Sequence, residues 1–156
     1  MDNDRVLLHR AVEIAEKGIA EGSGPFGAVI TKNGKIISEA SNKVVLTHDP
    51  TAHAEVLAIR KAAGILKTYD LSDCVIYTSC EPCPMCLGSI YWAGIKKVIY
   101  ASDRQKAASS GFSDKMIYDE LILEPEKRKI AFVHLPDKDG DDVFRKWDEF
   151  EGKIPY

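Results

Sequence analysis

The sequence has neither a long hydrophobic run nor an excess of basic residues. No apolar stretch approaches the length of a membrane-spanning helix, and the opening residues MDNDRVLLHR are acidic and polar rather than typical of a signal peptide. The 21 Lys and Arg residues are fewer than the 24 Asp and Glu residues, which gives a formal net charge of -3. We therefore expect neither a nucleic acid nor a membrane as a partner.

Cysteine is also scarce, with four residues in a chain of 156, and three of them stand in one C-x-x-C-x-x-C run. This pattern is typical of metal chemistry in a reducing compartment rather than of a disulfide framework, so it predicts a cytoplasmic location. A chain of this length, with 45% hydrophobic residues, fits a single domain spanning 1–156 with its own core.

Two short motifs, TAHAEV at residues 51–56 and SCEPCPMCLG at residues 79–88, supply one histidine, one glutamate and a Cys-x-x-Cys pair. Cys83 and Cys86 would share one face in the first turn of a helix, where both thiols can bind the same metal. His53 offers a third ligand and leaves a fourth position for water, as in catalytic rather than closed structural zinc sites. Glu55 is then predicted to carry protons beside that water. Together these residues predict a hydrolytic zinc site.

The remaining cysteines and histidines are not expected to bind the metal. Cys80 could extend the pair into an iron–sulfur run, but that reading needs a fourth cysteine, and Cys74 lies inside a predicted strand. We predict that Cys80 is a buried neighbour of the site and that Cys74 belongs to the core. The histidines without a supporting pattern are His9, His48 and His134.

Hydrophobic periodicity and turn residues predict an α/β chain. Asn33-Gly34 separates two β-branched runs and predicts an antiparallel hairpin with a type I′ turn. A strand, the cysteine loop, a helix and another strand form a crossover, which places the metal at the carboxyl end of a strand and the amino ends of two helices. The expected helices are 4–20, one opened by Asp49-Pro50-Thr51 and ended before Gly64, 84–92, 114–122 and 141–150. The expected strands are 27–31, 35–41, 74–79, 97–100 and 129–135.

The two motif blocks, 51–60 and 78–93, resemble the cytidine and purine deaminase superfamily, whose H-x-E…P-C-x-x-C signature they reproduce. The whole chain resembles the short bacterial guanine deaminases. That second resemblance rests on Asn42 before the first motif, on the Gly111-Phe112-Ser113-Asp114 segment followed by Tyr118, and on a chain that stops at an aromatic residue.

The resemblance implies a three-layer α/β/α cytidine deaminase-like fold with a central mixed five-stranded sheet. It also implies one Zn²⁺ per subunit and a domain-swapped homodimer, in which residues from about 102 to 156 cross to the partner. Tyr156 would then close the neighbouring subunit's pocket.

The resemblance also assigns roles to single residues. Asn42 would hydrogen-bond the base, Phe26 would pack on its ring, and Asp114 would receive the N1–H and amino edge of guanine and help to move protons. Glu55 and Asp114 are thus the expected catalytic residues. The expected metal ligands are His53, Cys83 and Cys86, and the expected substrate-binding residues are Phe26, Asn42, Ala54, Trp92, Asp114 and Tyr156.

The function implied is the hydrolysis of a purine base, guanine, to xanthine and ammonia. A tRNA-specific adenosine deaminase shares both motifs, but such an enzyme should display a basic surface, and this chain is acidic. A cytosine or cytidine deaminase is a further alternative. A structural zinc module is the non-enzymatic alternative, and it would need a fourth protein ligand such as Cys80.

Overall fold

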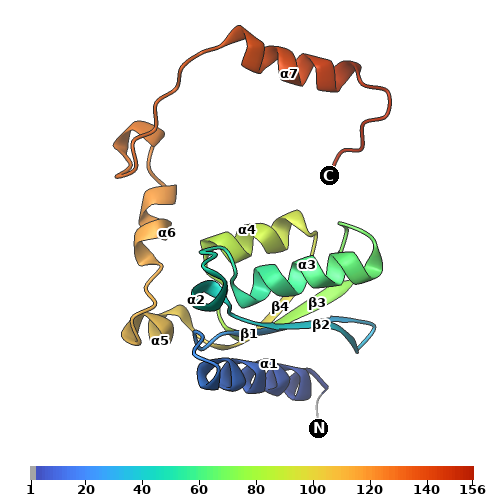
Figure 1. Cartoon of the computed structure of the whole chain (residues 1–156), viewed down its shortest axis with the longest axis vertical. Coiled ribbons are helices and arrows are strands. Elements are labelled where there is room, and N and C mark those ends of the chain that lie inside the picture. Colours follow the sequence, from blue (N-terminus) through green and yellow to red (C-terminus); the bar gives the residue numbers. More distant parts are fainter. Residues whose placement is uncertain (1–2) are drawn as a thin grey trace. The chain divides into compact units, whose positions relative to one another are not determined.

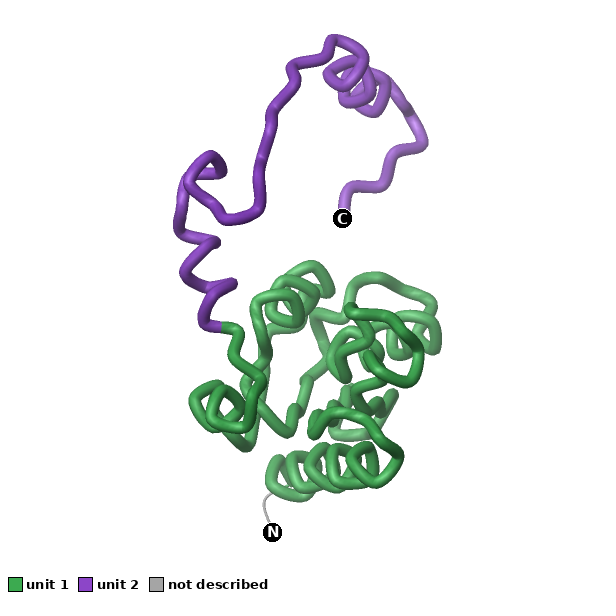
Figure 2. The backbone as a smooth tube through the Cα atoms, turned by 60° about the vertical axis from the view of Figure 1, so that its left-hand side comes forward, with its two compact units in different colours: residues 1–114 green, residues 115–156 purple. Residues whose placement is uncertain are grey.

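The computed structural model describes residues 3–156, which form two compact units (Figure 2). The first unit ends at Asp114, and the second runs from Lys115 to Tyr156. Among the described residues, no helix is both long and apolar enough to cross a membrane.

The first unit is built around a mixed sheet with the strand order β2-β1-β3-β4. Strand β1 runs antiparallel to both of its neighbours, whereas β3 and β4 are parallel. The parallel pair is joined through α4, as the crossover prediction required. The strands are β1 (Gly27–Lys32), β2 (Lys35–Ser41), β3 (Cys74–Cys80) and β4 (Lys97–Ser102).

The β1–β2 connection is the hairpin that the sequence predicts. Asn33 has a φ of 51° and Gly34 a φ of 73°, so both turn residues lie in the left-handed region, as a type I′ turn requires. Lys32 pairs with Lys35 directly beside this turn. The hairpin prediction is confirmed.

Helices cover both faces of the sheet, and Figure 1 shows α1 on one side with α3 and α4 on the other. Alternate side chains of each strand pack against the helices on one face or the other, because successive side chains of a strand point to opposite faces. The α1 side buries Leu7, Ala11, Val29 and Tyr77. The other side buries a larger cluster that includes Ala28, Ile30, Ala54, Ala58, Ile76 and Ile90. The helices are α1 (Asn3–Ala20), α3 (Ala54–Leu66) and α4 (Pro84–Trp92).

A glycine sets the contact between α1 and the sheet. A Cβ placed on Gly27 would lie 2.2 Å from the carbonyl oxygen of Ala11 and 2.7 Å from the nitrogen of Ala15, both backbone atoms of α1. Any side chain here would push the helix away from β1. This close approach sets the position of the first residue of β1. The residues just before it belong to the candidate site.

Two short helices, α2 (Val44–Thr47) and α5 (Arg104–Ser109), complete the first unit. The second unit contains α6 (Lys115–Leu121), a 3₁₀ turn (Pro125–Lys127) and α7 (Lys138–Glu149). The predicted helices near 114–122 and 141–150 are thus present.

The expectation of a five-stranded sheet is wrong for the described residues, which form four strands. The missing strand is 129–135, which the structure shows without regular secondary structure. A strand persists only where a neighbouring backbone pairs with it. Residues 115–156 contain no strand, so the β-prone residues of this segment find no ladder within their own unit.

Candidate metal and catalytic site

Three metal-binding side chains converge at one end of the first unit. His53, Cys83 and Cys86 place one donor atom each within 4.8 Å of the others. The sulfur of Cys83 lies 3.6 Å from Nδ1 of His53, and the sulfur of Cys86 lies 3.4 Å from the same nitrogen. Among residues 3–156 this is the group whose geometry could hold a metal ion.

Helix starts position these donors. His53 is the N-cap residue of α3, and Cys83 is the N-cap residue of α4, which continues with Pro84 at its first turn. Both caps have extended backbone angles, and neither side chain makes a capping hydrogen bond. The imidazole and the thiol therefore remain directed at the metal group, while the two helix amino ends favour negative charge there.

The donor set fits zinc. With Zn–N near 2.05 Å and Zn–S near 2.3 Å, a tetrahedral ion separates its nitrogen and sulfur ligands by about 3.6 Å. The two N–S distances, 3.6 and 3.4 Å, agree with this value. One imidazole and two thiols are ligands that zinc accepts. Three protein ligands, with the fourth position left for water, are the pattern of catalytic zinc sites.

The charges of the cysteines are strongly coupled. A hydrogen bond from Cys86, supported by His53, lowers the pKa of Cys83 to about 4 although burial opposes the shift. The same pairing with Cys83, together with burial, raises the pKa of the Cys86 thiol. The hydrogen bond with Cys83 also raises the pKa of His53.

Glu55 lies beside this group on the first turn of α3, with only 6% of its surface exposed. The thiol of Cys86 donates a hydrogen bond to Oε2 of Glu55 at 3.4 Å. Burial raises the pKa of the Glu55 carboxyl, with the negative charge of Cys83 adding to the shift. A carboxyl with a raised pKa is a stronger base than an ordinary carboxylate, which suits it to take up a proton beside a metal site and return it.

The position of Glu55 depends on where α3 starts. The sequence predicted an opening near Pro50, but the helix begins at Ala54, after a turn in which the carboxylate of Asp49 accepts hydrogen bonds from Thr51. Because His53 precedes the first full turn, both His53 and Glu55 can contact Cys86 although they are only two residues apart. Gly64, expected beyond the end of the helix, lies inside it.

Cys80 is buried close to the site but is not part of the metal group. Its sulfur donates to the backbone oxygen of Asp103 at 3.6 Å. Burial, followed by the charge of Glu55, raises the pKa of the Cys80 thiol to about 11. This placement agrees with the prediction that Cys80 is a buried neighbour of the site. Cys74 lies in the core cluster, and His9, His48 and His134 are exposed.

Two of the predicted substrate-binding residues lie side by side at the amino end of β1. The backbone N–H of Asn42 donates to the carbonyl oxygen of Phe26 at 2.9 Å. Asn42 is buried, and its Oδ1 accepts the N–H of Val44 at 3.1 Å, which orients the side-chain amide. Gly24 makes room for both, because a Cβ there would lie 3.4 Å from the Phe26 ring and 3.5 Å from Cγ of Asn42.

An aromatic neighbour of Phe26 carried no role in the sequence analysis. The ring of Phe112 meets the ring of Phe26 edge to face, with centroids 5.0 Å apart and an interplanar angle of 89°. The sequence offered one signal, since both aromatic residues directly follow or precede glycine-containing turns. Pairing across such a distance in the chain is set by tertiary structure, which spacing alone does not reveal.

Asp114 is half-buried at the end of the first unit. Burial raises the pKa of its carboxyl, the negative charge of Cys83 adds to this, and Arg104 opposes it. Ala54, between His53 and Glu55, is fully buried. In contrast, Trp92 ends α4 with 71% of its surface exposed, and Tyr156 is 81% exposed in the second unit.

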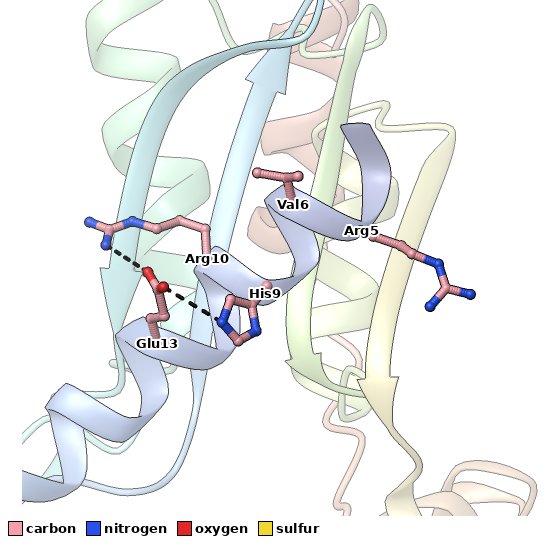
Figure 3. A pocket seen from close by; sticks show the side chains of 5 residues that line it. All are labelled: Arg5, Val6, His9, Arg10 and Glu13. Carbon is pink, nitrogen blue, oxygen red and sulfur yellow. Dashed lines mark hydrogen bonds and ion pairs between the residues drawn. The ribbon is translucent and has the colours of Figure 1, made fainter. Parts of the chain in front are cut away.

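A surface hollow on α1 is separate from these residues. Figure 3 shows side chains that project from the outer face of this helix, with Glu13 between two partners. Glu13 pairs with Arg10 at 3.1 Å and with His9 at 3.7 Å. All of the lining residues are exposed, and α1 covers the face of the sheet opposite α3 and α4. The hollow is lined by Arg5, Val6, His9, Arg10 and Glu13.

Comparisons with known proteins show the family of this chain. Residues 1–102 match the family described as the cytidine and deoxycytidylate deaminase zinc-binding region. The guanine deaminase of Bacillus subtilis (strain 168) is 50% identical over 155 residues, which cover 99% of both chains. Its X-ray structure aligns with a TM-score of 0.95 over 97% of this chain and 98% of that one.

A more distant relative is the tRNA-specific adenosine deaminase of Buchnera aphidicola subsp. Baizongia pistaciae, which is 38% identical over 101 residues, 65% of this chain and 62% of its own. The resemblance predicted from the two motifs is therefore confirmed. The protein belongs to the cytidine and deoxycytidylate deaminase family.

Proposed function

We propose that this protein hydrolyses guanine to xanthine and ammonia. The observation that carries the proposal is the buried carboxyl of Glu55 beside three converging metal donors, in a chain half identical to a guanine deaminase over nearly its whole length. The reaction consumes one water and releases one ammonia, so it needs a nucleophile, a proton carrier and a pocket for a flat base.

His53, Cys83 and Cys86 would hold one Zn²⁺ per chain. A bound zinc ion supplies Lewis acidity that makes a water molecule a better nucleophile at neutral pH. Because two sulfur ligands give it more negative charge than three imidazoles would, a neighbouring base is required to take the proton. Glu55 is the group placed for that task.

Glu55 would accept a proton from the attacking water and return it to the ring nitrogen of the base. As the C2–N bond breaks, it would take the remaining proton of the added hydroxyl group and pass it to the departing amino group, which leaves as ammonia. The raised pKa of this buried carboxyl supports both directions of transfer, because it is a stronger base than an exposed carboxylate and its protonated form can then donate.

Asp114 and Asn42 would recognise the edges of guanine. Guanine presents donors at N1 and at its amino group, and a carboxylate is the complementary acceptor, whereas adenine presents an acceptor at N1. The oriented amide of Asn42 would hydrogen-bond the base. Ala54 would line the pocket at the first turn of α3, where backbone N–H groups lack helical partners. Phe26 would pack on the ring.

We further propose a homodimer in which the C-terminal part of each chain crosses to its partner. None of residues 115–156 is buried in a single chain, although the segment contains many large apolar side chains. A surface of this kind is normally covered by another protein surface. In the dimer, Tyr156 would close the partner's pocket, and Trp92 would contribute to its wall. The four free cysteines support a cytoplasmic location.

A panel of substrates tests the proposal. Ammonia release from the purified protein would be measured with guanine, guanosine, adenine, cytosine, cytidine and tRNA, and xanthine would be identified by its absorbance. Guanine should react fastest. A panel in which tRNA or a cytosine compound reacts and guanine does not would overturn the substrate assignment. Absence of any ammonia release from zinc-loaded protein would favour a structural zinc module.

A further inference from the structure

The chain between β4 and Asp114 is attached to the loop that carries the metal-binding cysteines. Cys80 pairs with Ser102 in the parallel β3–β4 ladder, and the N–H of Glu81 donates to the oxygen of Ser102 at 2.8 Å. Arg104, two residues after Ser102, is the first residue of α5, and its N–H donates to Oε2 of the same Glu81 at 3.1 Å. The start of α5 is thereby fixed relative to Cys83.

The end of α5 is fixed as well. The N–H of Phe112 donates to the oxygen of Ala107 at 3.0 Å, and the N–H of Gly111 donates to the oxygen of Ala108 at 3.1 Å. Gly111 has a φ of +92°, so the helix closes in a Schellman motif with glycine in the left-handed position. This closure sets the direction in which the chain leaves the helix and carries the next residue.

That next residue, Phe112, meets the ring of Phe26, which we propose packs on the substrate base. The edge-to-face contact of Phe112 with Phe26 is a preferred aromatic geometry. Phe26 is joined in turn to the buried Asn42 by a backbone hydrogen bond of 2.9 Å. A continuous set of contacts therefore leads from Glu81, beside the cysteine loop, through α5 to the ring of Phe26.

We propose that Phe112 is a positioning residue for the substrate base, and that Glu81 holds the turn that presents it. The inference rests on the proposed function and adds two residues to which the sequence analysis gave no role. Phe112 acts by fixing the ring of Phe26 at the angle needed to pack on a flat base. Glu81 acts one step further away, by fixing the first turn of α5.

Neither Phe112 nor Glu81 belongs to the metal group or transfers a proton in the proposed reaction. Their loss should therefore weaken substrate binding more than it slows the chemical step. Removing an interaction made equally with substrate and transition state raises KM and leaves kcat unchanged. A purely structural role would instead lower kcat through loss of folded, zinc-loaded protein. Measuring KM, kcat and zinc content for each variant therefore distinguishes a positioning role from a purely structural one.

The experiment compares Phe112→Ala, Phe112→Leu and Phe112→Tyr in the full-length protein. The first two remove the aromatic edge and should raise KM for guanine by about fivefold, with kcat and zinc content near the wild-type values. Phe112→Tyr keeps the ring and should restore KM. Ile36→Ala is the matched control, since Ile36 is 45% exposed, Phe112 is 46% exposed, and Ile36 lies at the hairpin end of β2.

The same assay with Glu81→Ala should raise KM in the same way, and Glu81→Gln, which keeps an acceptor oxygen for Arg104, should recover most of the loss. Gln105→Ala, on the same helix, is the control. Unchanged KM in Phe112→Ala and Phe112→Leu, with an active wild-type protein, would overturn the positioning role alone. A wild-type protein that does not deaminate guanine would overturn this inference together with the proposed function.

Discussion

The two units of this chain differ in what covers their apolar side chains. In the first unit, both faces of the sheet are closed by helices, and two buried clusters fill the space between them. In the second unit, no residue of 115–156 is buried. Its exposed apolar residues include Ile122, Ile130, Phe132, Val133, Leu135, Val143, Phe144 and Ile154.

This difference separates chemistry from assembly. The three metal donors and Glu55 all come from the amino ends of two helices in the first unit, so one chain supplies them without help. In α7, Val143, Phe144 and Trp147 lie on one side of the helix, because residues three and four apart are neighbours on a helix surface. An apolar face of this kind needs a covering surface, which the proposed partner subunit would provide.

The largest effect should come from a change in the first unit. Glu55→Gln removes the proton carrier but leaves a side chain of the same shape beside Cys86. We expect kcat for guanine to fall by about 10³-fold, within the usual contribution of general acid–base catalysis. The zinc content, measured by atomic emission, and the thermal unfolding temperature should stay close to those of the wild type.

Glu13→Gln, an equally isosteric change at an exposed position of α1, is the control and should leave kcat unaltered. A Glu55→Gln protein that turned over guanine at a near-normal rate would show that another group carries the proton. It would also break the assignment of the chemistry to the first unit.

Features that depend on short stretches of sequence could be predicted well. The Asn33-Gly34 turn needs only two residues that tolerate positive φ, and both have it. The metal group needs only the right residues at the starts of two helices, and the sequence placed His53 and the Cys83–Cys86 pair there. Such features are encoded locally, so periodicity, caps and spacing were sufficient.

Features that depend on distant partners could not be predicted. Residues 129–135 have the composition of a strand, but a strand needs a neighbouring backbone, and composition does not say whether one is present. The contact of Phe112 with Phe26 depends on how α5 closes and on where β1 begins. One local feature was also missed: α3 starts at Ala54 rather than near Pro50, because the turn made by Asp49 competes with the helix and propensities do not rank the two.

An intermediate effect should follow from a charge on the apolar face of α7. Phe144→Asp should raise the dissociation constant of the proposed dimer by about 30-fold or more, because an aromatic side chain that the interface would bury is replaced by an unpaired carboxylate. Sedimentation velocity at several protein concentrations measures this shift. Zinc content should not change, since every metal donor lies in the first unit.

Arg145→Asp introduces the same acid on the polar face of α7, where Arg145 pairs with Glu149 at 2.9 Å on the surface, and should leave the dimer intact. Equal dissociation of both variants would mean that net charge rather than the apolar face controls assembly. A wild-type protein that is monomeric at all concentrations would contradict the proposed exchange of C-terminal segments.

The smallest effect concerns the stability of the first unit alone. Arg10 binds Glu39 through two hydrogen bonds, of 2.7 and 2.9 Å, that join α1 to β2 on the surface. Arg10→Ala should lower the free energy of unfolding by up to about 1 kcal/mol at pH 7, the range of exposed ion pairs, without changing dimerisation. Arg5→Ala, also exposed on α1, is the control.

The pH dependence of this difference has a definite sign. The hydrogen bond from Arg10 holds the pKa of the Glu39 carboxyl below its ordinary value of 4.5, although partial burial opposes the shift. A lowered pKa in the folded state means that the stabilisation is fully present above pH 4.5 and is lost as the pH falls through the folded value. Urea unfolding of the wild type and Arg10→Ala should therefore differ at pH 7 and converge once the pH falls below the folded-state pKa of Glu39. A difference that persisted at the lower pH would assign the effect of Arg10 to packing of its side chain rather than to its charge.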